Sequence, residues 1–249
     1  MSSDFDLTGK ISIVTGAGRG IGRGIAEALA RHGAIVVLSG RTKETLDLAA
    51  DAIGARARTH VADVTKEAEV ISLRDAVLAR YGKIDVLVNN AGVNPIWKGI
   101  EKTSMEEWQT VLDTNLTGTF VCCKHIGSAM ERGGSIVNIS SVAGHVGLTR
   151  SVPYCASKGG VEMMTKALAI DWASRGVRAN TLAPGWVDTE LTHNLLTHDV
   201  HGKRMLERTP LGRFATPRDM AGGVVFLASD ASAFMTGQSL VIDGGWGAE

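Results

Sequence analysis

The sequence lacks any run of apolar residues as long as the roughly 18 that a membrane-spanning helix needs. Its first ten residues, MSSDFDLTGK, include two acids and have no apolar core, which is not the pattern of a signal peptide. An excess of one charge is also absent, because 26 basic residues balance 26 acidic residues. We therefore expect a cytoplasmic protein whose main partner is neither a nucleic acid nor a membrane.

Cysteine is scarce as well. The three cysteines, Cys122, Cys123 and Cys155, are odd in number and lack the spacing of a disulfide framework. The adjacent pair also lacks the spacing of a zinc site. These observations predict buried, reduced thiols and no metal centre.

Short apolar runs rich in β-branched residues alternate with longer segments of helical periodicity. Strands are expected at 10–16, 34–40, 57–64, 84–92, 134–141, 177–185 and 239–245, and helices at 20–33, 42–54, 66–82, 104–133, 153–176 and 217–230. Nearly continuous apolar strands indicate a parallel sheet that is covered on both faces. The sequence thus predicts one α/β domain over 1–249, a Rossmann-type doubly wound parallel sheet of about seven strands with helices on both faces.

A glycine-rich loop, TGAGRGIG (15–22), lies between the first expected strand and the first expected helix. Gly16, Gly20 and Gly22 would let backbone N–H groups approach a phosphate closely, at the positive end of the helix. The alternative, a tight strand-to-helix turn without a ligand, is less favoured because Gly16, Gly20 and Gly22 all fall within seven residues.

The residues after the second expected strand bear on the choice of dinucleotide. NAD-binding proteins place an acidic residue there for the ribose hydroxyls, whereas this chain has Ser39, Gly40 and Arg41. Arg41 and Arg19 could pair with a 2′-phosphate, although both could also be ordinary surface arginines. We expect NADP(H) to be preferred, with NAD(H) as the alternative.

One of only two tyrosines precedes a lysine by four residues in SVPYCASKGG (151–160). This spacing places Tyr154 and Lys158 on the same face of a helix. A free tyrosine has a pKa near ~10, and a nearby cation would lower it toward the range useful for proton transfer. On its own such a pair is usually a surface contact.

The chain resembles the classical short-chain dehydrogenases/reductases along nearly its whole length. The matching segments, which appear in the family's order and spacing, are TGAGRGIG (15–22), NNAG (89–92), Asn115 in DTNLTG, Ser141 in VNISS, YCASK (154–158), APGWVDT (183–189) and VIDGG (241–245).

The resemblance implies a role for each matching residue. Tyr154 would exchange a proton with the reacting oxygen, Ser141 would hydrogen-bond that oxygen, Lys158 would hold the nicotinamide ribose, and Asn115 would hold a water that links Lys158 to solvent. Ser140 could compete with Ser141, and Asn115 could be partly structural. The implied cofactor-binding residues are Gly16, Gly18, Arg19, Gly20, Ile21, Gly22, Arg41, Asp63, Val64, Asn90, Ala91, Gly92, Tyr154, Lys158, Pro184, Gly185, Val187 and Thr189.

The implied activity is the NADP(H)-dependent interconversion of a ketone and a secondary alcohol. The C-terminal segment is similar both to gluconate 5-dehydrogenase-like enzymes and to 3-oxoacyl-carrier-protein reductases. We favour a small polar carbonyl, polyol or sugar-acid substrate; a non-catalytic NADP-binding regulator is a distant alternative.

Substrate contacts are expected from three segments. These are 94–97, the loop 142–146, and a mobile lid at 186–210. His145 could bind a polar substrate or simply pack in its loop. We expect the lid histidines His193, His198 and His201 to lie on a solvated surface rather than to form a metal site.

Two expected helices, 104–131 and 153–175, are apolar on most sides. Such a helix needs a second partner besides its own sheet. We therefore expect a homotetramer formed through these helices, as is common in the family the chain resembles. A thick monomer core is the alternative.

Overall fold

The computed structural model of the chain describes residues 4–248. The strands are β1 (Ile11–Thr15), β2 (Ile35–Gly40), β3 (Ala57–Val61), β4 (Val86–Asn89), β5 (Ser135–Ile139), β6 (Arg178–Pro184) and β7 (Ser239–Ile242). The helices are α1 (Gly20–Arg31), α2 (Lys43–Ile53), α3 (Glu67–Tyr81), α4 (Met105–Leu112), α5 (Gly118–His125), α6 (Val152–Trp172), α7 (His193–Leu196), α8 (His201–Glu207) and α9 (Pro217–Ala228).

All seven strands form one parallel sheet in the order β3-β2-β1-β4-β5-β6-β7. The prediction of a doubly wound parallel sheet of about seven strands is confirmed. The strand order reverses between β1 and β4, which pair through Ser12 with Val86 and Val14 with Val88. In such folds ligands bind outside the carboxyl ends of the strands at this reversal.

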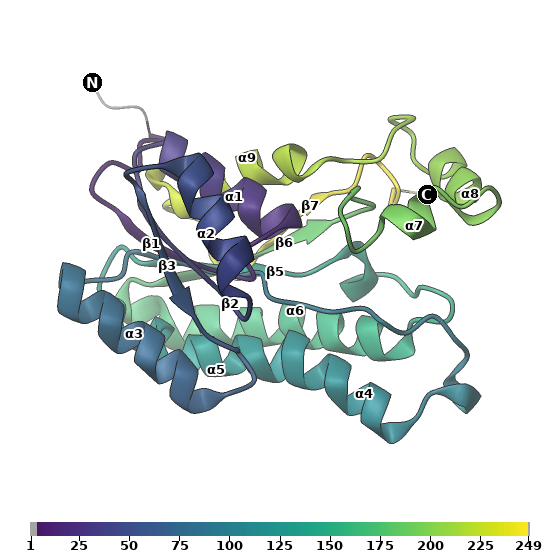
Figure 1. Cartoon of the computed structure of the whole chain (residues 1–249), viewed down its shortest axis with the longest axis horizontal. Helices are drawn as coiled ribbons and strands as arrows, with labels where there is room; N and C mark the ends of the chain where they lie inside the picture. The colour runs from purple at the N-terminus through teal and green to yellow at the C-terminus, as the bar shows by residue number, and fades with distance from the viewer. Residues whose placement is uncertain (1–3, 249) are drawn as a thin grey trace.

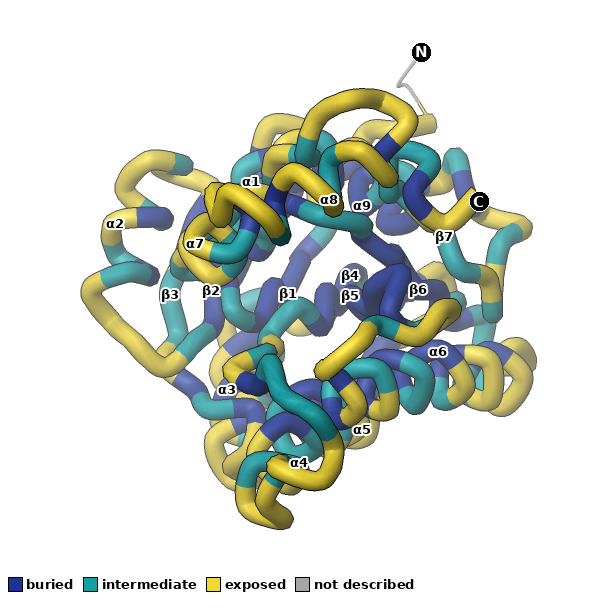
Figure 2. Tube along the Cα trace, turned by 90° about the vertical axis from the view of Figure 1, so that its right-hand side faces the viewer, coloured by how far each residue is buried: buried dark blue, intermediate teal, exposed yellow. Residues whose placement is uncertain are grey.

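Helices cover both faces of the sheet (Figure 1). Helices α1, α2 and α9 lie on one face, and α3, α4, α5 and α6 lie on the other. Each face has its own apolar core: Leu29 and Met220 belong to the first, and Leu73 and Ile126 to the second, and all four are at most 1% exposed. The central strands β1, β4 and β5 are buried along their whole length because both faces are covered (Figure 2).

The segment expected as one helix at 104–133 is interrupted and ends earlier. It begins as expected, with a capping box in which the Ser104 hydroxyl accepts from the Glu107 N–H. A π-helical turn at Asp113–Thr117 then separates α4 from α5, and a short 3₁₀ helix ends at Ala129. Gly118 follows the π turn where the chain presses on Val64, since a Cβ there would lie 2.7 Å from the Val64 Cγ2. The helical periodicity of the sequence does not indicate close packing of this kind, so the interruption of the helix was not predicted.

The segment between β6 and α9 contains the two short helices α7 and α8. They lie at the end of the molecule toward which β6 points, and their outer surfaces are exposed (Figures 1 and 2). Within residues 4–248, no helix is long and apolar enough to cross a membrane.

Candidate active site

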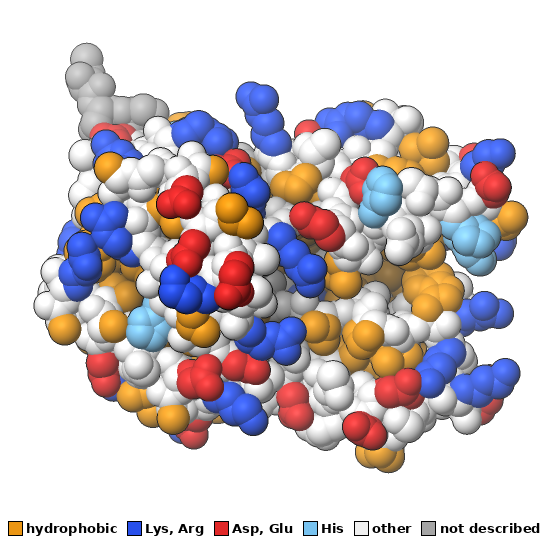
Figure 3. All heavy atoms as spheres, viewed as in Figure 1, with side chains coloured by type: hydrophobic (Ala, Val, Ile, Leu, Met, Phe, Trp, Pro, Cys, Tyr) orange, Lys and Arg blue, Asp and Glu red, His pale blue; other side chains and the backbone are white. Residues whose placement is uncertain are grey.

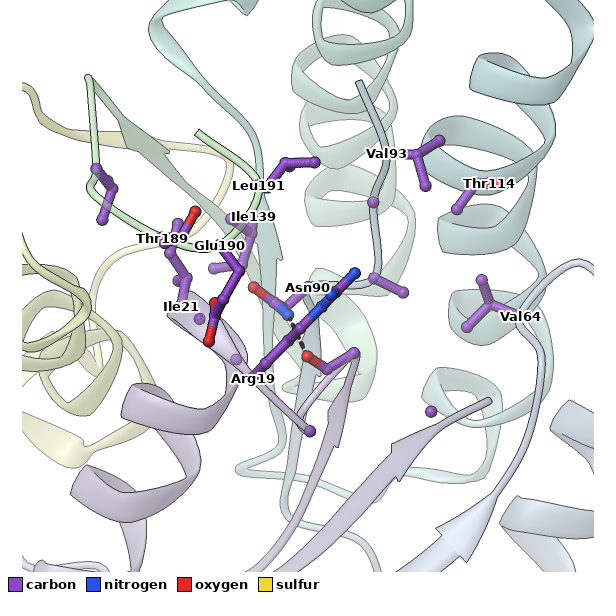
Figure 4. Close-up of a pocket in the computed structure, with 18 of the residues that line it drawn as sticks. Arg19, Ile21, Val64, Asn90, Val93, Thr114, Ile139, Thr189, Glu190 and Leu191 are labelled. Atoms are coloured by element: carbon purple, nitrogen blue, oxygen red, sulfur yellow. Dashed lines mark hydrogen bonds between the residues drawn. The ribbon is translucent and has the colours of Figure 1, made fainter. Parts of the chain in front are cut away.

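A cleft of about 520 Å³ lies along the carboxyl ends of the central strands (Figure 4). Its walls come from the loops that follow β1, β2, β3, β4, β5 and β6, together with the start of α6. The volume falls within the range of sites for cofactor-sized ligands. Basic and acidic side chains are interspersed on the face of the molecule seen in Figure 3.

The glycine-rich loop forms one wall of this cleft, and its glycines are sterically required. Gly16 has a φ of +64°, and a Cβ at Gly22 would lie 2.3 Å from the Gly16 carbonyl oxygen. Asn90, which follows β4, donates from its amide Nδ2 to the carbonyl oxygens of Thr15 and Gly16 at 3.0 and 3.1 Å. The loop is thus held open at the N-terminus of α1, whose first turn contains no acidic residue.

Substituting Gly22 by Ala is expected to weaken binding of the expected dinucleotide at least about tenfold, because the added methyl group must push Gly16 and Asn90 out of place. Its Cβ would also lie 2.4 Å from the Asn90 Nδ2. Fluorescence titration with NADPH measures the effect.

Gly222→Ala is the matched control for that titration. Gly222 is exposed on α9, and a Cβ there would meet nothing within 4 Å among the described residues. It should leave the NADPH affinity unchanged and raise the stability slightly. Equal affinities for the Gly22→Ala variant and the parent would show that the loop does not approach the cofactor.

Two arginines line the cleft near the glycine-rich loop. Arg41 follows β2, and Arg19 precedes α1 and points into the cleft beside Asn90 and Glu190 (Figure 4). Within residues 4–248, neither guanidinium makes a hydrogen bond or an ion pair. Asp63 lines the same end, and its Oδ1 accepts from the backbone N–H and the hydroxyl of Thr65, both at 2.9 Å. This end therefore offers two unpaired cations to an anionic ligand.

Ser141, Tyr154 and Lys158 line the same cleft, and Ser141 follows β5, which lies across β1 and β4 from β2 and β3 in the sheet. The Ser141 hydroxyl accepts from the Ala143 N–H at 3.1 Å. Tyr154 and Lys158 lie one turn apart at the start of α6, with the lysine Nζ 5.8 Å from the centre of the tyrosine ring. A hydroxyl, a phenol and an ammonium in one cleft can bind and protonate a developing oxyanion.

The two titratable groups of this cluster are both shifted by burial. Lys158 is 5% exposed, its Nζ donates to the Ile139 carbonyl oxygen at 2.7 Å, and desolvation lowers its pKa to about 8 against the opposing charge of Glu162. Desolvation raises the pKa of Tyr154, while hydrogen bonding with Ser141 lowers it in part. The expected lowering of the tyrosine pKa is therefore not found in the chain alone. For the pKa of the phenol, desolvation outweighs the attraction of the Lys158 ammonium, because the ammonium is directed to the Ile139 carbonyl oxygen instead.

Asn115 lies in the π turn, just behind the cleft rather than on its wall. Its Oδ1 accepts from the Val93 N–H at 2.8 Å, and its Nδ2 donates to the Val93 carbonyl and to the Ser157 hydroxyl at 3.0 and 3.1 Å. A Cβ at Gly92 would lie 3.3 Å from this Oδ1 and 3.7 Å from the Lys158 Nζ. Asn115 thus makes the structural hydrogen bonds that were expected of it, and it makes them close to Lys158.

Comparisons with known proteins agree with this geometry. The family model described as "Enoyl-(Acyl carrier protein) reductase" matches residues 16–247. D-threitol dehydrogenase of Mycolicibacterium smegmatis is 43% identical over 248 residues, which cover 98% of this chain and 95% of that protein. The 3-oxoacyl-[acyl-carrier-protein] reductase of Synechocystis sp. is 41% identical over 249 residues, covering 96% and 97%. The chain belongs to the short-chain dehydrogenase/reductase family.

A solved structure of the same family is similar throughout. Gluconate 5-dehydrogenase of Burkholderia cenocepacia J2315, in complex with NADP and tartrate, has a TM-score of 0.93 and 36% identity, with 99% of this chain and 98% of that chain covered. The chain is accordingly an oxidoreductase that uses a nicotinamide dinucleotide. The glycine cradle, in which a Cβ at Gly16 would lie 2.9 Å from the Ala91 Cα, fits such a ligand because it leaves backbone exposed to the phosphates.

The structure brings all eighteen expected cofactor-binding residues to the cleft wall, together with Ser141. Sequence reasoning missed a second set of lining residues, most of them small or apolar: Gly40, Thr42, Thr45, Leu46, Ala62, Val93, Thr114 and Ile139. Most of these flank a motif residue by one or two positions, which was the available signal. The cleft is also lined by Ser140, which was named as a competitor of Ser141, and by Glu190, Leu191 and Thr192 of the expected lid.

His145 does not line the cleft. Its ring Nε2 instead lies 3.0 Å from the Ser239 hydroxyl and 3.1 Å from a carboxylate oxygen of Glu162. The lid histidines are exposed or half-buried, and no group of three metal-binding side chains exists within residues 4–248.

Proposed function

We propose that the chain is an NADP(H)-dependent oxidoreductase that interconverts a ketone and a secondary alcohol. The observation that carries this proposal is that Ser141, Tyr154 and Lys158 line the same cleft as the glycine-rich loop. A proton donor and a hydride donor are then held within the same cavity.

The nicotinamide cofactor, when bound, supplies or accepts the hydride. The side chains of the chain itself manage the proton. Tyr154 donates it to the carbonyl oxygen during reduction, and the Ser141 hydroxyl hydrogen-bonds that oxygen as negative charge develops. Lys158 binds ribose hydroxyls and, once turned from Ile139, stabilises the tyrosinate that remains.

The preference for NADP(H) is supported by Arg19 and Arg41, which line the cleft without an acidic partner. Arg41→Ala is expected to raise the Kd for NADPH about tenfold and to leave the Kd for NADH nearly unchanged, because only NADPH carries the 2′-phosphate. Titration of both cofactors against parent and variant measures the difference.

Arg31→Ala is the control for Arg41→Ala, since Arg31 ends α1 far from the cleft and the change in net charge is the same. An Arg41→Ala variant that loses affinity for both cofactors equally would contradict the assignment. A parent protein that binds NADH more tightly would contradict the preference itself.

A small polyol or sugar acid is the substrate class we favour, supported by the D-threitol and gluconate 5-dehydrogenases among the relatives. A 3-oxoacyl thioester on a carrier protein is the second candidate, supported by the Synechocystis reductase. Lys124, which could meet an acidic carrier, is paired with Glu67 at 2.8 Å, so the first class is favoured.

NADPH oxidation against 5-ketogluconate, small diketones, a 3-oxoacyl ester and a ketosteroid tests the proposal. Turnover of 5-ketogluconate supports the first class, and turnover of the ester alone favours the second. NADPH binding without turnover, in this panel and with NADP plus the matching alcohols, would contradict the enzymatic function and support a regulator.

The same proposal includes a lid and an assembly. The segment 186–210, with α7 and α8, is the proposed substrate lid within a single domain. The outer sides of α4, α5 and α6 expose Met105, Phe120, Met163 and Ile170, each at least 51% exposed, which supports a homotetramer formed through these helices. Light scattering of the purified protein tests the assembly.

Free thiols at Cys122 and Cys123 support a reducing compartment such as the cytoplasm.

A further inference from the structure

A buried carboxylate outside the cleft needs a physical explanation. Glu162 lies on α6, one turn after Lys158, and is 6% exposed. It does not line the cleft. Burying a carboxylate is costly unless its oxygens are hydrogen-bonded, and an apolar side chain in such a position is often no less stable. We therefore look for the contribution of Glu162 in the positioning of neighbouring residues rather than in the stability of the fold.

The carboxylate of Glu162 joins three other elements. Its Oε2 accepts from the Thr181 hydroxyl on β6 at 2.8 Å, and its Oε1 accepts from the Ser239 hydroxyl on β7 at 3.2 Å. The ring Nε2 of His145 lies 3.1 Å from the same Oε1 and 3.0 Å from the Ser239 oxygen. Both oxygens of the carboxylate are thereby satisfied.

Ser141 and His145 flank the same short 3₁₀ helix. We define residues 140–146 as the Ser141 loop; it contains a short 3₁₀ helix, Val142–Gly144, with Ser141 at its N-terminus and His145 at its C-terminus. The loop packs directly on α6. A Cβ at Gly144 would lie 2.9 Å from the Ser140 Oγ, 3.0 Å from the Lys158 carbonyl oxygen and 3.1 Å from the Glu162 Cγ. The far end of the loop is thus fixed by Glu162.

We propose that Glu162 is a positioning residue: through His145 it holds the Ser141 loop in register with the part of α6 that carries Tyr154 and Lys158. The proposal rests on the proposed function, because it requires that Ser141 acts on the reacting oxygen. Displacement of a hydrogen-bond donor by about 1 Å can cost on the order of 100-fold in rate. Neither Glu162 nor His145 needs to touch the substrate for this effect.

A double-mutant cycle with Ser141 tests the proposal. In the parent background, Glu162→Leu is expected to lower kcat at least about tenfold with an unchanged Kd for NADPH. In a Ser141→Ala background the same change should lower kcat less than about twofold, since a donor that is already removed cannot be misplaced. Glu162→Gln keeps an acceptor for Ser239 and His145 and should restore most of the parent rate.

Measurement at pH 6.5, by single turnover at high enzyme concentration, separates this effect from the charge of Lys158. Lys158, with a pKa of about 8, is largely protonated at that pH. An effect transmitted through the lysine would also persist in the Ser141→Ala background. Equal losses in both backgrounds, or a parent-like kcat in Glu162→Leu, would overturn the proposal.

His145→Leu provides a second route to the same answer if Glu162→Leu does not fold, which circular dichroism and Tm reveal. The His145 side chain is 37% exposed, so its replacement is expected to be tolerated. It should reproduce the loss in the parent and show none in Ser141→Ala; a parent-like kcat would overturn the proposal. If Ser141→Ala alone leaves turnover intact, the proposed function fails instead, and the two failures are distinguishable.

Discussion

Tyr154→Phe is expected to lower turnover about 1,000-fold while changing the Kd for NADPH less than about twofold. The variant removes only the phenolic oxygen, and a well-placed general acid contributes roughly 10² to 10⁴ in rate. Binding should survive, because the glycine-rich loop and the two cleft arginines are unchanged in the variant. Steady-state NADPH oxidation and fluorescence titration of the same preparation measure both quantities.

Tyr81→Phe is the matched control, since Tyr81 is the only other tyrosine in the chain. It ends α3, lies outside the cleft and stacks against the Arg80 guanidinium, 5.5 Å from the ring centre. Its replacement should leave turnover within about twofold of the parent. If Tyr154→Phe retains more than about a tenth of the parent turnover, water or Ser141 supplies the proton and Tyr154 is not the general acid.

The arrangement of the sheet could be predicted because its signals are local. Each strand is a short apolar run that ends at a turn residue, and parallel strands joined by helices leave few topologies. Gly16 and Asn90 lie far apart in the sequence but at the ends of the adjacent strands β1 and β4. The resemblance to the short-chain dehydrogenases/reductases implied that both bind the cofactor, and their position at the carboxyl ends of adjacent strands agrees with where ligands bind in such folds.

The features that the sequence did not predict depend on contacts between distant segments. Glu190 belongs to the expected lid at 186–210, but its place beside Gly20 depends on how the chain after β6 bends back, and no periodicity encodes that bend. His145 could be placed near Ser141 by its number, but its partners are Glu162 and Ser239, the second of them 94 residues away. The expected lowering of the Tyr154 pKa is not found in the chain alone for the same reason, because the desolvation that raises this pKa is set by the packed structure.

Lys158 illustrates how a functional residue can cost stability. A lysine has a usual pKa near 10.5, and in the folded chain that of Lys158 is about 8. Between these values the unfolded chain binds more protons than the folded chain, so the free energy of unfolding rises with pH from about 8 to about 10.5. Below pH 8 the folded protein bears the whole cost of a buried ammonium, which at this shift is about 3 kcal/mol.

Lys158→Met is therefore expected to stabilise the chain at pH 7 while it lowers turnover at least about 100-fold. Methionine has a similar length and no charge, but it forfeits the hydrogen bond to the Ile139 carbonyl, which offsets about 1 kcal/mol. The remaining gain of about 2 kcal/mol corresponds to a rise in Tm of about 5 °C for a chain of this size. Thermal unfolding followed by circular dichroism measures it.

The pH dependence of the gain in Tm shows whether removal of the buried charge of Lys158 is its cause. The difference in Tm between Lys158→Met and the parent should be widest at pH 7 and should narrow at pH 9.5, where the parent lysine is largely neutral. Cys122 and Cys123, whose pKa values burial also raises, titrate alike in both proteins and leave the difference unaffected. Lys166→Met, on the exposed side of the same helix, should shift the Tm by less than about 1 °C at either pH. A difference that is constant with pH would assign the gain to packing, and a lower Tm at pH 7 would show that the bond to Ile139 outweighs the buried charge.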